Sequence, residues 1–285
     1  MLTTSQINIV KATVPVLESH GEQLTQHFYQ IMLRDYPEVR PFFNQAAQTS
    51  GRQPRALANS LLMYAKHIDN PAPLLELIGT ISHKHASLQI QPEQYQIVGT
   101  CLLQAISEVL GTNVATPEVI AAWQAAYFAL AAVLTKKEEE LYKHSETAQG
   151  GWRGERLFYV ADKVPESTII TSFYLKPVDG QPVLAHQAGQ FLGFRFIFAD
   201  GEQRRNYSIS EQANGEYYRI SVKREPNGKV SNYLHDHVQI GDQLRVFPPF
   251  GHFTLKPSQR PLAFISGGVG ITPMVPLLQE ALNTG

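Results

Sequence analysis

The sequence predicts a multidomain chain in which an all-α part comes first, an antiparallel β-barrel follows, and the first strand and helix of an α/β domain come last. Three observations along the 285 residues lead to this prediction. Apolar residues recur at helical spacing up to about residue 145, short β-type runs follow Gly151, and a buried-looking run after Arg260 leads into a glycine-rich turn. One ordinary core rarely serves so long a chain, so two domains and part of a third are expected.

The overall composition excludes several classes of protein. Hydrophobic residues make up 43% of the chain, which favours a folded core over disorder. The 24 basic and 25 acidic residues leave a net charge of -1, so no nucleic-acid or anionic-membrane partner is indicated. The one cysteine, Cys101, cannot form an internal disulfide and suits a reducing cytoplasm. We see no signal peptide before Pro15 and no apolar stretch of the roughly 20 residues that span a bilayer, so we expect a cytoplasmic protein. The sequence leaves the oligomeric state open, and a monomer is one option.

The helix expected after Pro73 carries a histidine on its apolar face. One stripe with spacings of three and four residues contains Leu74, Ile78, Ile81, His85 and Leu88. His83, two residues from His85, points roughly the other way. A histidine that faces a core needs partners for its ring nitrogens, so His85 either bonds a backbone carbonyl or ligates a metal.

Other polar side chains also fall on inward faces of predicted helices. Glu138 lies on a stripe that includes Trp123 and Leu134, as a paired carboxylate or as part of a solvated charge run over 136–140. Tyr95 points inward from a helix that starts at Pro92, and a core tyrosine is the alternative. In the two earlier helices three further residues belong to this set: Tyr29, Gln53 and Leu57.

These residues carry a resemblance to a known family. The run from His83 to Ile90, the segment Pro92 to Tyr95, Phe42-Phe43-Asn44 and Tyr29 resemble the globin domain of bacterial flavohemoglobins, and the likeness continues along essentially the whole chain. It implies that His85 is the proximal haem ligand and that Tyr95 and Glu138 hydrogen-bond and orient it. It further implies that Lys84 tunes the haem potential and that the distal pocket contains Tyr29, Gln53 and Leu57.

The β-type region contains a candidate flavin site. Runs at 157–161, 168–175, 191–198, 217–223 and 243–247 are expected strands, separated by turn residues as in a β-barrel. The motif Arg205-Asn206-Tyr207-Ser208 resembles the flavin-binding strand of ferredoxin-reductase-type barrels, where a tyrosine ring can lie against the isoalloxazine and an arginine can meet the pyrophosphate. Phe191, in Gly189-Gln190-Phe191, takes a position that is often tyrosine in such barrels. Gly228 to Ser231 resembles a helix start that receives phosphate, although an Asn-Gly hairpin turn is the alternative.

A second phosphate turn is expected near residue 270. Leu262 to Ile265 reads as a buried strand, and a helix is expected from Pro273 onward. The turn between them resembles the nicotinamide-binding turn of the reductase family; its candidate residues are Gly268, Val269, Gly270, Ile271, Thr272 and Pro273. A plain strand-to-helix turn is the alternative.

The resemblance implies a globin domain over 1–146, an FAD-binding barrel over 147–257 and a partial NAD(P)-binding domain over 258–285, within which the chain ends. It implies haem b, FAD and NAD(P)H as cofactors. The activity implied is nitric oxide dioxygenation, in which haem-bound dioxygen oxidises nitric oxide to nitrate with electrons from NAD(P)H through FAD. An oxygen-binding or oxygen-sensing globin with a vestigial flavin domain is one alternative, and a plain flavin reductase with a structural helical domain is another.

Overall fold

A computed structural model describes residues 2–43, 51–256 and 260–284 of the chain. Its contacts divide the chain into two compact units. Unit 1 consists of Met1–Ser82 and Ile90–Glu139, and unit 2 of His83–Gln89 and Glu140–Gly285.

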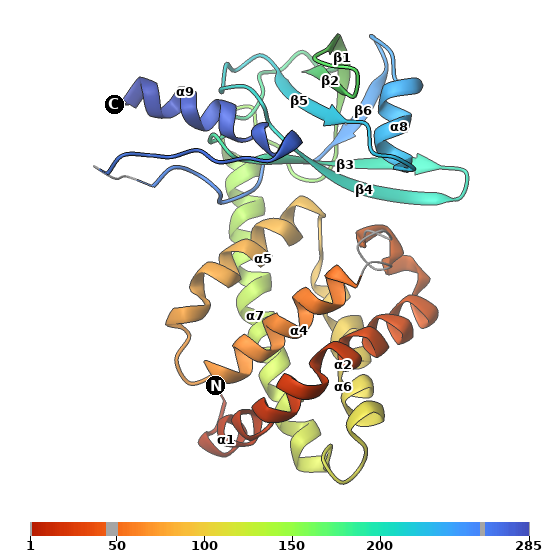
Figure 1. Ribbon diagram of the computed structural model, residues 1–285, viewed down its shortest axis with the longest axis vertical. Helices are drawn as coiled ribbons and strands as arrows, with labels where there is room; N and C mark the ends of the chain where they lie inside the picture. The colour runs from red at the N-terminus through yellow and green to blue at the C-terminus, as the bar shows by residue number, and fades with distance from the viewer. Residues whose placement is uncertain (1, 44–50, 257–259, 285) are drawn as a thin grey trace. The chain divides into compact units, whose positions relative to one another are not determined.

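Unit 1 is built from helices alone in its described part, as the helical periodicity predicts (Figure 1). Their starts follow the expected local rules: Thr3 forms a capping box with Gln6, and Pro92 occupies the first turn of its helix. The last residues of two of these helices, α5 and α7, belong to unit 2. The helices are α1 (Thr4–Ala12), α2 (Val14–Asp35), the 3-10 turn η1 (Pro37–Phe42), α4 (Arg52–Lys66), the 3-10 turn η2 (Ala72–Leu74), α5 (Leu75–Ser87), α6 (Pro92–Leu110) and α7 (Pro117–Thr147).

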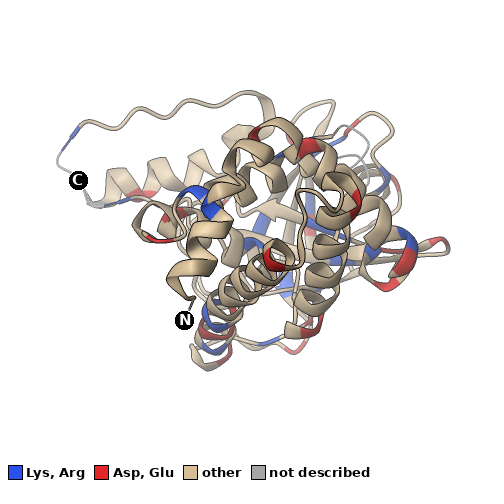
Figure 2. Ribbon diagram, turned by 90° about the horizontal axis from the view of Figure 1, so that it is seen from below, with Lys and Arg blue, Asp and Glu red and all other residues tan. Residues whose placement is uncertain are grey.

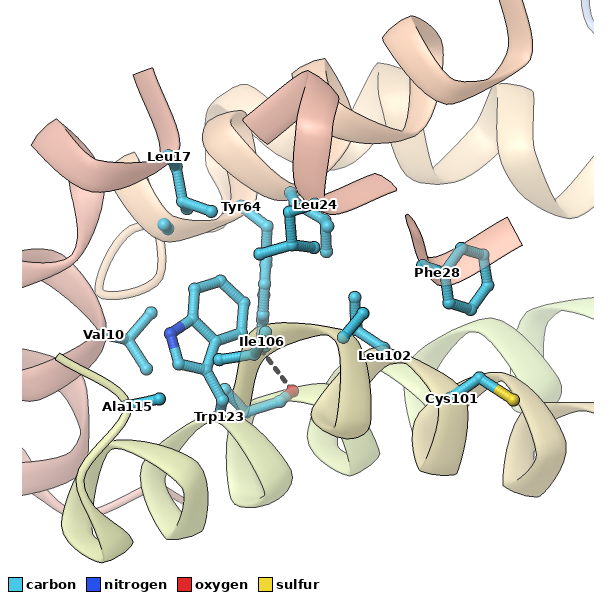
Figure 3. Close-up of a cluster of buried hydrophobic side chains, with 14 of the residues drawn as sticks. Val10, Leu17, Leu24, Phe28, Tyr64, Cys101, Leu102, Ile106, Ala115 and Trp123 are labelled. Atoms are coloured by element: carbon cyan, nitrogen blue, oxygen red, sulfur yellow. Dashed lines mark hydrogen bonds between the residues drawn. The ribbon is translucent and has the colours of Figure 1, made fainter. Parts of the chain in front are cut away.

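The apolar faces of these helices meet in one core (Figure 3). Trp123 is fully enclosed there, and its indole N–H donates to Thr13 Oγ1 at 3.2 Å. The Tyr64 hydroxyl donates to the carbonyl oxygen of Ala126 at 2.8 Å. Both polar tips therefore find partners inside the core, as buried indole and phenol groups require.

Helix α7 differs from the expectation that no apolar stretch is long enough to span a bilayer. Within the described residues it is long and apolar enough, by length and composition, to cross a bilayer. Its residues Ala122, Trp123 and Ala126 nevertheless pack into the core of unit 1. A core helix passes the same test of length and composition, so one such helix is weak evidence for a membrane span.

Unit 2 is organised around a six-stranded antiparallel sheet with the order β4-β3-β6-β1-β2-β5. A bridge between Ile209 and Ile220 links the chain just after β4 to β5, so the two edges of the sheet meet as in the predicted barrel. Residues alternate between buried and partly exposed along β5, and large aromatic side chains such as Phe158, Phe173 and Phe194 fill the interior. The strands are β1 (Arg156–Pro165), β2 (Ile170–Pro177), β3 (Phe191–Phe198), β4 (Gly201–Ser208), β5 (Tyr218–Lys223) and β6 (Gln243–Val246).

Arg156 anchors the chain segment that leads into the barrel. Its guanidinium group donates to the carbonyl oxygens of Gly150, Gln181 and Pro182, each at 3.1 Å. It also donates to both carboxylate oxygens of Asp179, at 3.0 and 2.7 Å. One side chain therefore ties the segment before β1 to the loop after β2.

The last part of unit 2 departs from one prediction. The expected strand from Leu262 to Ile265 is irregular, and these two side chains are 52% and 85% exposed. A strand needs a neighbouring strand for its backbone hydrogen bonds, and none of the described strands pairs with this segment. The 3-10 turn η3 (Gly268–Ile271) and α9 (Met274–Thr284) follow. Helix α8 (Lys229–Asp236) lies earlier in the unit, between β5 and β6.

Charges of both signs are interspersed on the helices visible in Figure 2. This distribution agrees with the near-zero net charge of the sequence.

Candidate functional site

Tyr95 and Glu138 form a buried pair inside unit 1. Tyr95 on α6 donates its hydroxyl to Glu138 Oε1 on α7 at 2.5 Å, and the two residues are 7% and 2% exposed. The hydroxyl of Tyr127, in the same hydrophobic cluster, donates to the backbone carbonyl oxygen of Tyr95 at 2.7 Å. The stripes therefore placed both residues correctly, and Glu138 does not belong to a solvated charge run. A carboxylate keeps further acceptor capacity after one such bond.

The other candidates of unit 1 lie on α2 and α4. Tyr29 is 7% exposed, and its ring meets the edges of Phe28 and Phe43 at centroid distances of 4.8 and 5.6 Å. Gln53 stands in the first turn of α4, and its Oε1 atom is buried without a hydrogen-bond partner in the described part of the chain. Such an atom costs about 1–3 kcal/mol unless a ligand or solvent group meets it. Leu57 follows one turn later and packs on the core of unit 1. Asn44, named with Phe42 and Phe43, lies outside the described residues.

His85 lies in the last turn of α5 and is partly buried. Its neighbour His83 is engaged elsewhere, because His83 Nδ1 accepts a hydrogen bond from the backbone N–H of Gly251 at 3.0 Å. The His83 ring also lies 5.6 Å from that of His252. An imidazole donor is the usual protein ligand of haem iron in globins. With the buried phenol–carboxylate pair and the unpaired amide oxygen of Gln53, the donor set of this chain fits haem.

Lys84, Phe191 and Arg205 come together in unit 2. The Lys84 ammonium group lies 5.9 Å from the centre of the Phe191 ring. The Lys84 side chain is exposed, yet desolvation by the surrounding protein, together with the Arg205 charge, lowers its pKa. Burial likewise lowers the pKa of Arg205. Its guanidinium donates to two neutral oxygens of the described residues, the carbonyl of Arg204 and the side-chain amide of Gln203, at 2.7 Å each. No carboxylate pairs with either cation within the described ranges, so an anionic group such as a phosphate or a reduced flavin fits there.

The rest of the flavin motif is divided between two faces of β4. Tyr207 packs against the barrel core, with its ring 5.7 Å from that of Phe194, and burial raises its pKa. Ser208 is paired with Phe191 across the two strands. Asn206 faces differently: its Nδ2 donates to Ser87 Oγ at 2.7 Å, and its Oδ1 is buried and unpaired. Its assignment to cofactor binding stays a prediction.

The segment at Gly228 is a helix start and not a hairpin. Asn227 adopts φ 61°, and α8 begins at Lys229 with Gly228 as its N-cap. Ser231 Oγ accepts the N–H of Glu225 at 3.1 Å, so this hydroxyl already closes the turn. A Cβ on Gly228 would crowd that hydroxyl, which explains the glycine. Backbone N–H groups at such a start suit a phosphate, and with the Lys84 and Arg205 cations the residues fit FAD.

The turn from Gly268 to Pro273 is the most exposed of the predicted sites. Gly268 adopts φ 53°, which favours glycine, and the Thr272 hydroxyl donates to the Val269 carbonyl at 3.0 Å. The turn leads into α9, as expected. The expected strand directly before the turn is irregular and the turn lies near β5 instead, so its role as a phosphate turn stays a prediction.

A row of ion-paired residues on β3 and β4, beside the flavin motif, was not predicted from the sequence. Glu202 bridges two arginines, Arg195 at 2.5 Å and Arg204 at 2.7 Å, and Arg195 also meets Glu155 at 2.6 Å. The signal was present in the alternation of β4, because every second residue of a strand shares a face. Arg204 and Asn206 therefore form a set of their own, apart from Arg205 and Tyr207.

Comparison with known proteins assigns both halves of the chain. Residues 26–134 match the family described as Globin, and residues 159–255 match the Oxidoreductase FAD-binding domain. The chain is thus a globin joined to a flavin-dependent oxidoreductase domain of the ferredoxin-reductase type, an enzyme whose cofactors include haem and FAD.

Individual relatives narrow this class. The Flavohemoprotein of Pseudomonas putida is 59% identical over 284 residues, which cover all of this chain and 72% of that protein. The Flavohemoprotein of Pseudomonas aeruginosa is also 59% identical, over 99% of this chain and 72% of its own length. The crystal structure of flavohemoglobin from Malassezia yamatoensis, with bound FAD and heme, matches 99% of this chain and 74% of its own at a TM-score of 0.87 and 28% identity. The chain belongs to the flavohemoprotein family.

Proposed function

We propose that the protein is a cytoplasmic nitric oxide dioxygenase that converts nitric oxide and dioxygen to nitrate with electrons from NAD(P)H and so removes nitric oxide. The observation that carries the proposal is the buried hydrogen bond between Tyr95 and Glu138. An oxygen store has no need for a buried carboxylate near its iron ligand, whereas an enzyme that activates oxygen gains from one. Membership of the flavohemoprotein family supports the same conclusion.

In this proposal His85 ligates the haem iron and the Tyr95–Glu138 pair orients it. Tyr95 holds the carboxylate in place by donating to one of its oxygens, so that the remaining lone pairs can accept an imidazole N–H. A carboxylate that accepts from a metal-bound imidazole increases the basicity of that ligand. Bound haem supplies the oxygen chemistry, and bound FAD divides the electron pair of a hydride into single electrons.

The remaining candidates surround the two cofactors in the proposal. Tyr29 offers a hydroxyl and Gln53 an amide to a reacting oxygen that gains negative charge, and Leu57 keeps that side apolar. Arg205, Tyr207 and Ser208 hold the flavin, together with three other residues: Phe191, Gly228 and Ser231. Lys84 adds a positive charge beside them. Gly268 to Pro273 receives the nicotinamide phosphates.

A single-turnover experiment tests the reaction. Protein loaded with haem and FAD is reduced, exposed to dioxygen and mixed with nitric oxide, and nitrate is measured. One nitrate is expected for each haem, and Tyr29→Phe should slow its formation because a donor to the charged oxygen is lost. Tyr36→Phe, at the end of the same helix, is the matched control. Consumption of nitric oxide without nitrate would refute the proposal.

A further inference from the structure

Strand β4 presents a second functional face, opposite to Arg205 and Tyr207 of its flavin motif. Side chains alternate along a strand, so Arg204 and Asn206 project away from Arg205 and Tyr207. Both contact the end of α5, which belongs to the same compact unit as the sheet. Arg204 donates through its guanidinium to the carbonyl oxygen of Leu88, and Asn206 Nδ2 donates to Ser87 Oγ at 2.7 Å.

The contacts of Arg204 and Asn206 complete the hydrogen bonding at the end of α5. The N–H groups of Leu88 and Gln89 bond the carbonyl oxygens of His85 and Ala86 at 3.0 Å, and Gln89 ends the helix with φ 58°. The Ser87 hydroxyl donates back to the Lys84 carbonyl at 2.7 Å. Leu88 follows the last helical residue, and its carbonyl takes a cation, the charge that a helix C-terminus favours. His85 therefore sits in a turn whose terminal acceptors, the Leu88 carbonyl and Ser87 Oγ, receive their hydrogen bonds from donors on β4.

Strand β3 brings the sheet close enough for these contacts. Gly193 is the register partner of Asn206 on the neighbouring strand. A Cβ on Gly193 would overlap the carbonyl oxygen of Ser87, so only glycine permits this approach of sheet and helix end. Gly193 and Asn206 thus meet the same residue of α5 from adjacent strands.

The neighbours of Arg204 fix its side chain in the orientation that contacts Leu88. It stands opposite Arg195 in the β3–β4 register, where two like charges repel. Glu202 lies between them and pairs with both, and only 14% of the Arg204 side chain is exposed. The Phe247 ring lies 5.4 Å from its guanidinium carbon. These neighbours fix the long side chain before it meets Leu88.

We propose that Arg204 and Asn206 are positioning residues for His85: they anchor the last turn of the haem-ligand helix to the strand that carries Arg205 and Tyr207 on its other face. The inference rests on the proposed role of His85 as iron ligand. It makes β4 the element that sets the ligand imidazole relative to the flavin residues.

The test uses protein loaded with haem and FAD and compares four variants with the parent. Arg204→Met and Asn206→Leu remove one donor each, and Arg204→Lys keeps the charge without the planar fork. Arg245→Met is the matched control, because Arg245 meets Glu155 of the same row of ion-paired residues at 3.0 Å and donates nothing to α5. Two readouts are taken: amide hydrogen exchange at Leu88 and Gln89, and the iron–histidine stretching band of the reduced haem. The flavin spectrum reports FAD occupancy.

We expect Arg204→Met to speed exchange at both amides about tenfold to hundredfold, since a bond from a charged donor is lost. Asn206→Leu should have a smaller effect, and Arg204→Lys should restore part of the protection. The iron–histidine band should shift or broaden in the first two variants, with FAD retained, and stay unchanged in Arg245→Met.

Faster exchange with an unchanged band would show that the turn is anchored without positioning His85, and would overturn the proposal. Unchanged exchange would overturn it as well, and loss of FAD in Asn206→Leu would return that residue to the flavin site. Absence of the band from the parent would remove His85 as ligand and the proposal with it. The stretching band does not depend on nitrate formation. A failure of the dioxygenase assay with the band present would therefore refute the proposed function alone.

Discussion

Replacing Tyr95 by phenylalanine isolates the bond at the centre of the proposed function. The change removes one hydroxyl and keeps the ring, so it opens little cavity. The lost bond joins a phenol to the Glu138 carboxylate at 2.5 Å, and both groups are almost fully buried. A hydrogen bond to a charged group contributes about 1.5–3 kcal/mol. We therefore expect the free energy of unfolding of unit 1 to fall by about 2 kcal/mol, or roughly thirtyfold in the unfolding equilibrium.

The chain offers a clean assay for this change, because its two tryptophans fall in different units, Trp123 in unit 1 and Trp152 in unit 2. In a Trp152→Phe background, urea unfolding of the cofactor-free protein followed by fluorescence reports unit 1 alone. Tyr127→Phe is the matched control, since its hydroxyl meets a neutral carbonyl oxygen and its loss should cost about 1 kcal/mol. If Tyr95→Phe costs no more than this control, the buried carboxylate is not held as described.

Three further predictions concern other sites. Arg156→Met should lower the free energy of unfolding of unit 2 by about 3 kcal/mol, because three carbonyl oxygens lose a charged donor. Trp152 fluorescence measures this loss, and a loss below about 1 kcal/mol would mean that water replaces the guanidinium. Burial tends to raise the pKa of Glu155, but hydrogen bonds from its two arginine partners hold that pKa below its usual value. The stability that this carboxylate adds is thus present above its unfolded-state pKa and lost as the pH falls through its folded pKa. Glu155→Gln should therefore lower the free energy of unfolding at neutral pH and leave it unchanged in acid. A loss of stability that does not depend on pH would contradict this. His85→Ala should lose haem while His83→Ala keeps it, as the absorption spectrum will show; normal haem content in the first variant would remove His85 as ligand.

Helical periodicity was enough to predict which side chains of the helical half face inward. The stripe through Trp123 and Leu134 put Glu138 inside, and the structure encloses it. The stripe through α6 did the same for Tyr95. Periodicity could not show that the two residues bond each other, because that depends on how α6 and α7 pack. The resemblance implied only that both residues orient His85, so the bond of 2.5 Å between Tyr95 and Glu138 is a finding of the structure.

Periodicity was less informative where the partner of a segment decides its structure. Leu262 to Ile265 has the composition of a buried strand, yet it stays irregular without a strand beside it. The composition of a segment shows that it is apolar enough to be buried, but it does not show whether a neighbouring strand is present to cover it. Arg204 was overlooked for a related reason: its carbonyl partner, Leu88, lies 116 residues away in the chain, and no local pattern joins the two.

The division of the chain into compact units has a practical consequence for protein dissection. The short segment His83–Gln89 belongs with the β-sheet, although it interrupts the helical half of the sequence. A fragment cut near residue 146 would keep every globin helix but remove the arginine, the amide and the close glycine that support the end of α5. Such a fragment would need its own cap after Ser87, for example a glycine in place of Gln89, whose φ of 58° suits that residue. Domain swaps within the family therefore have to exchange β3 and β4 together with this turn.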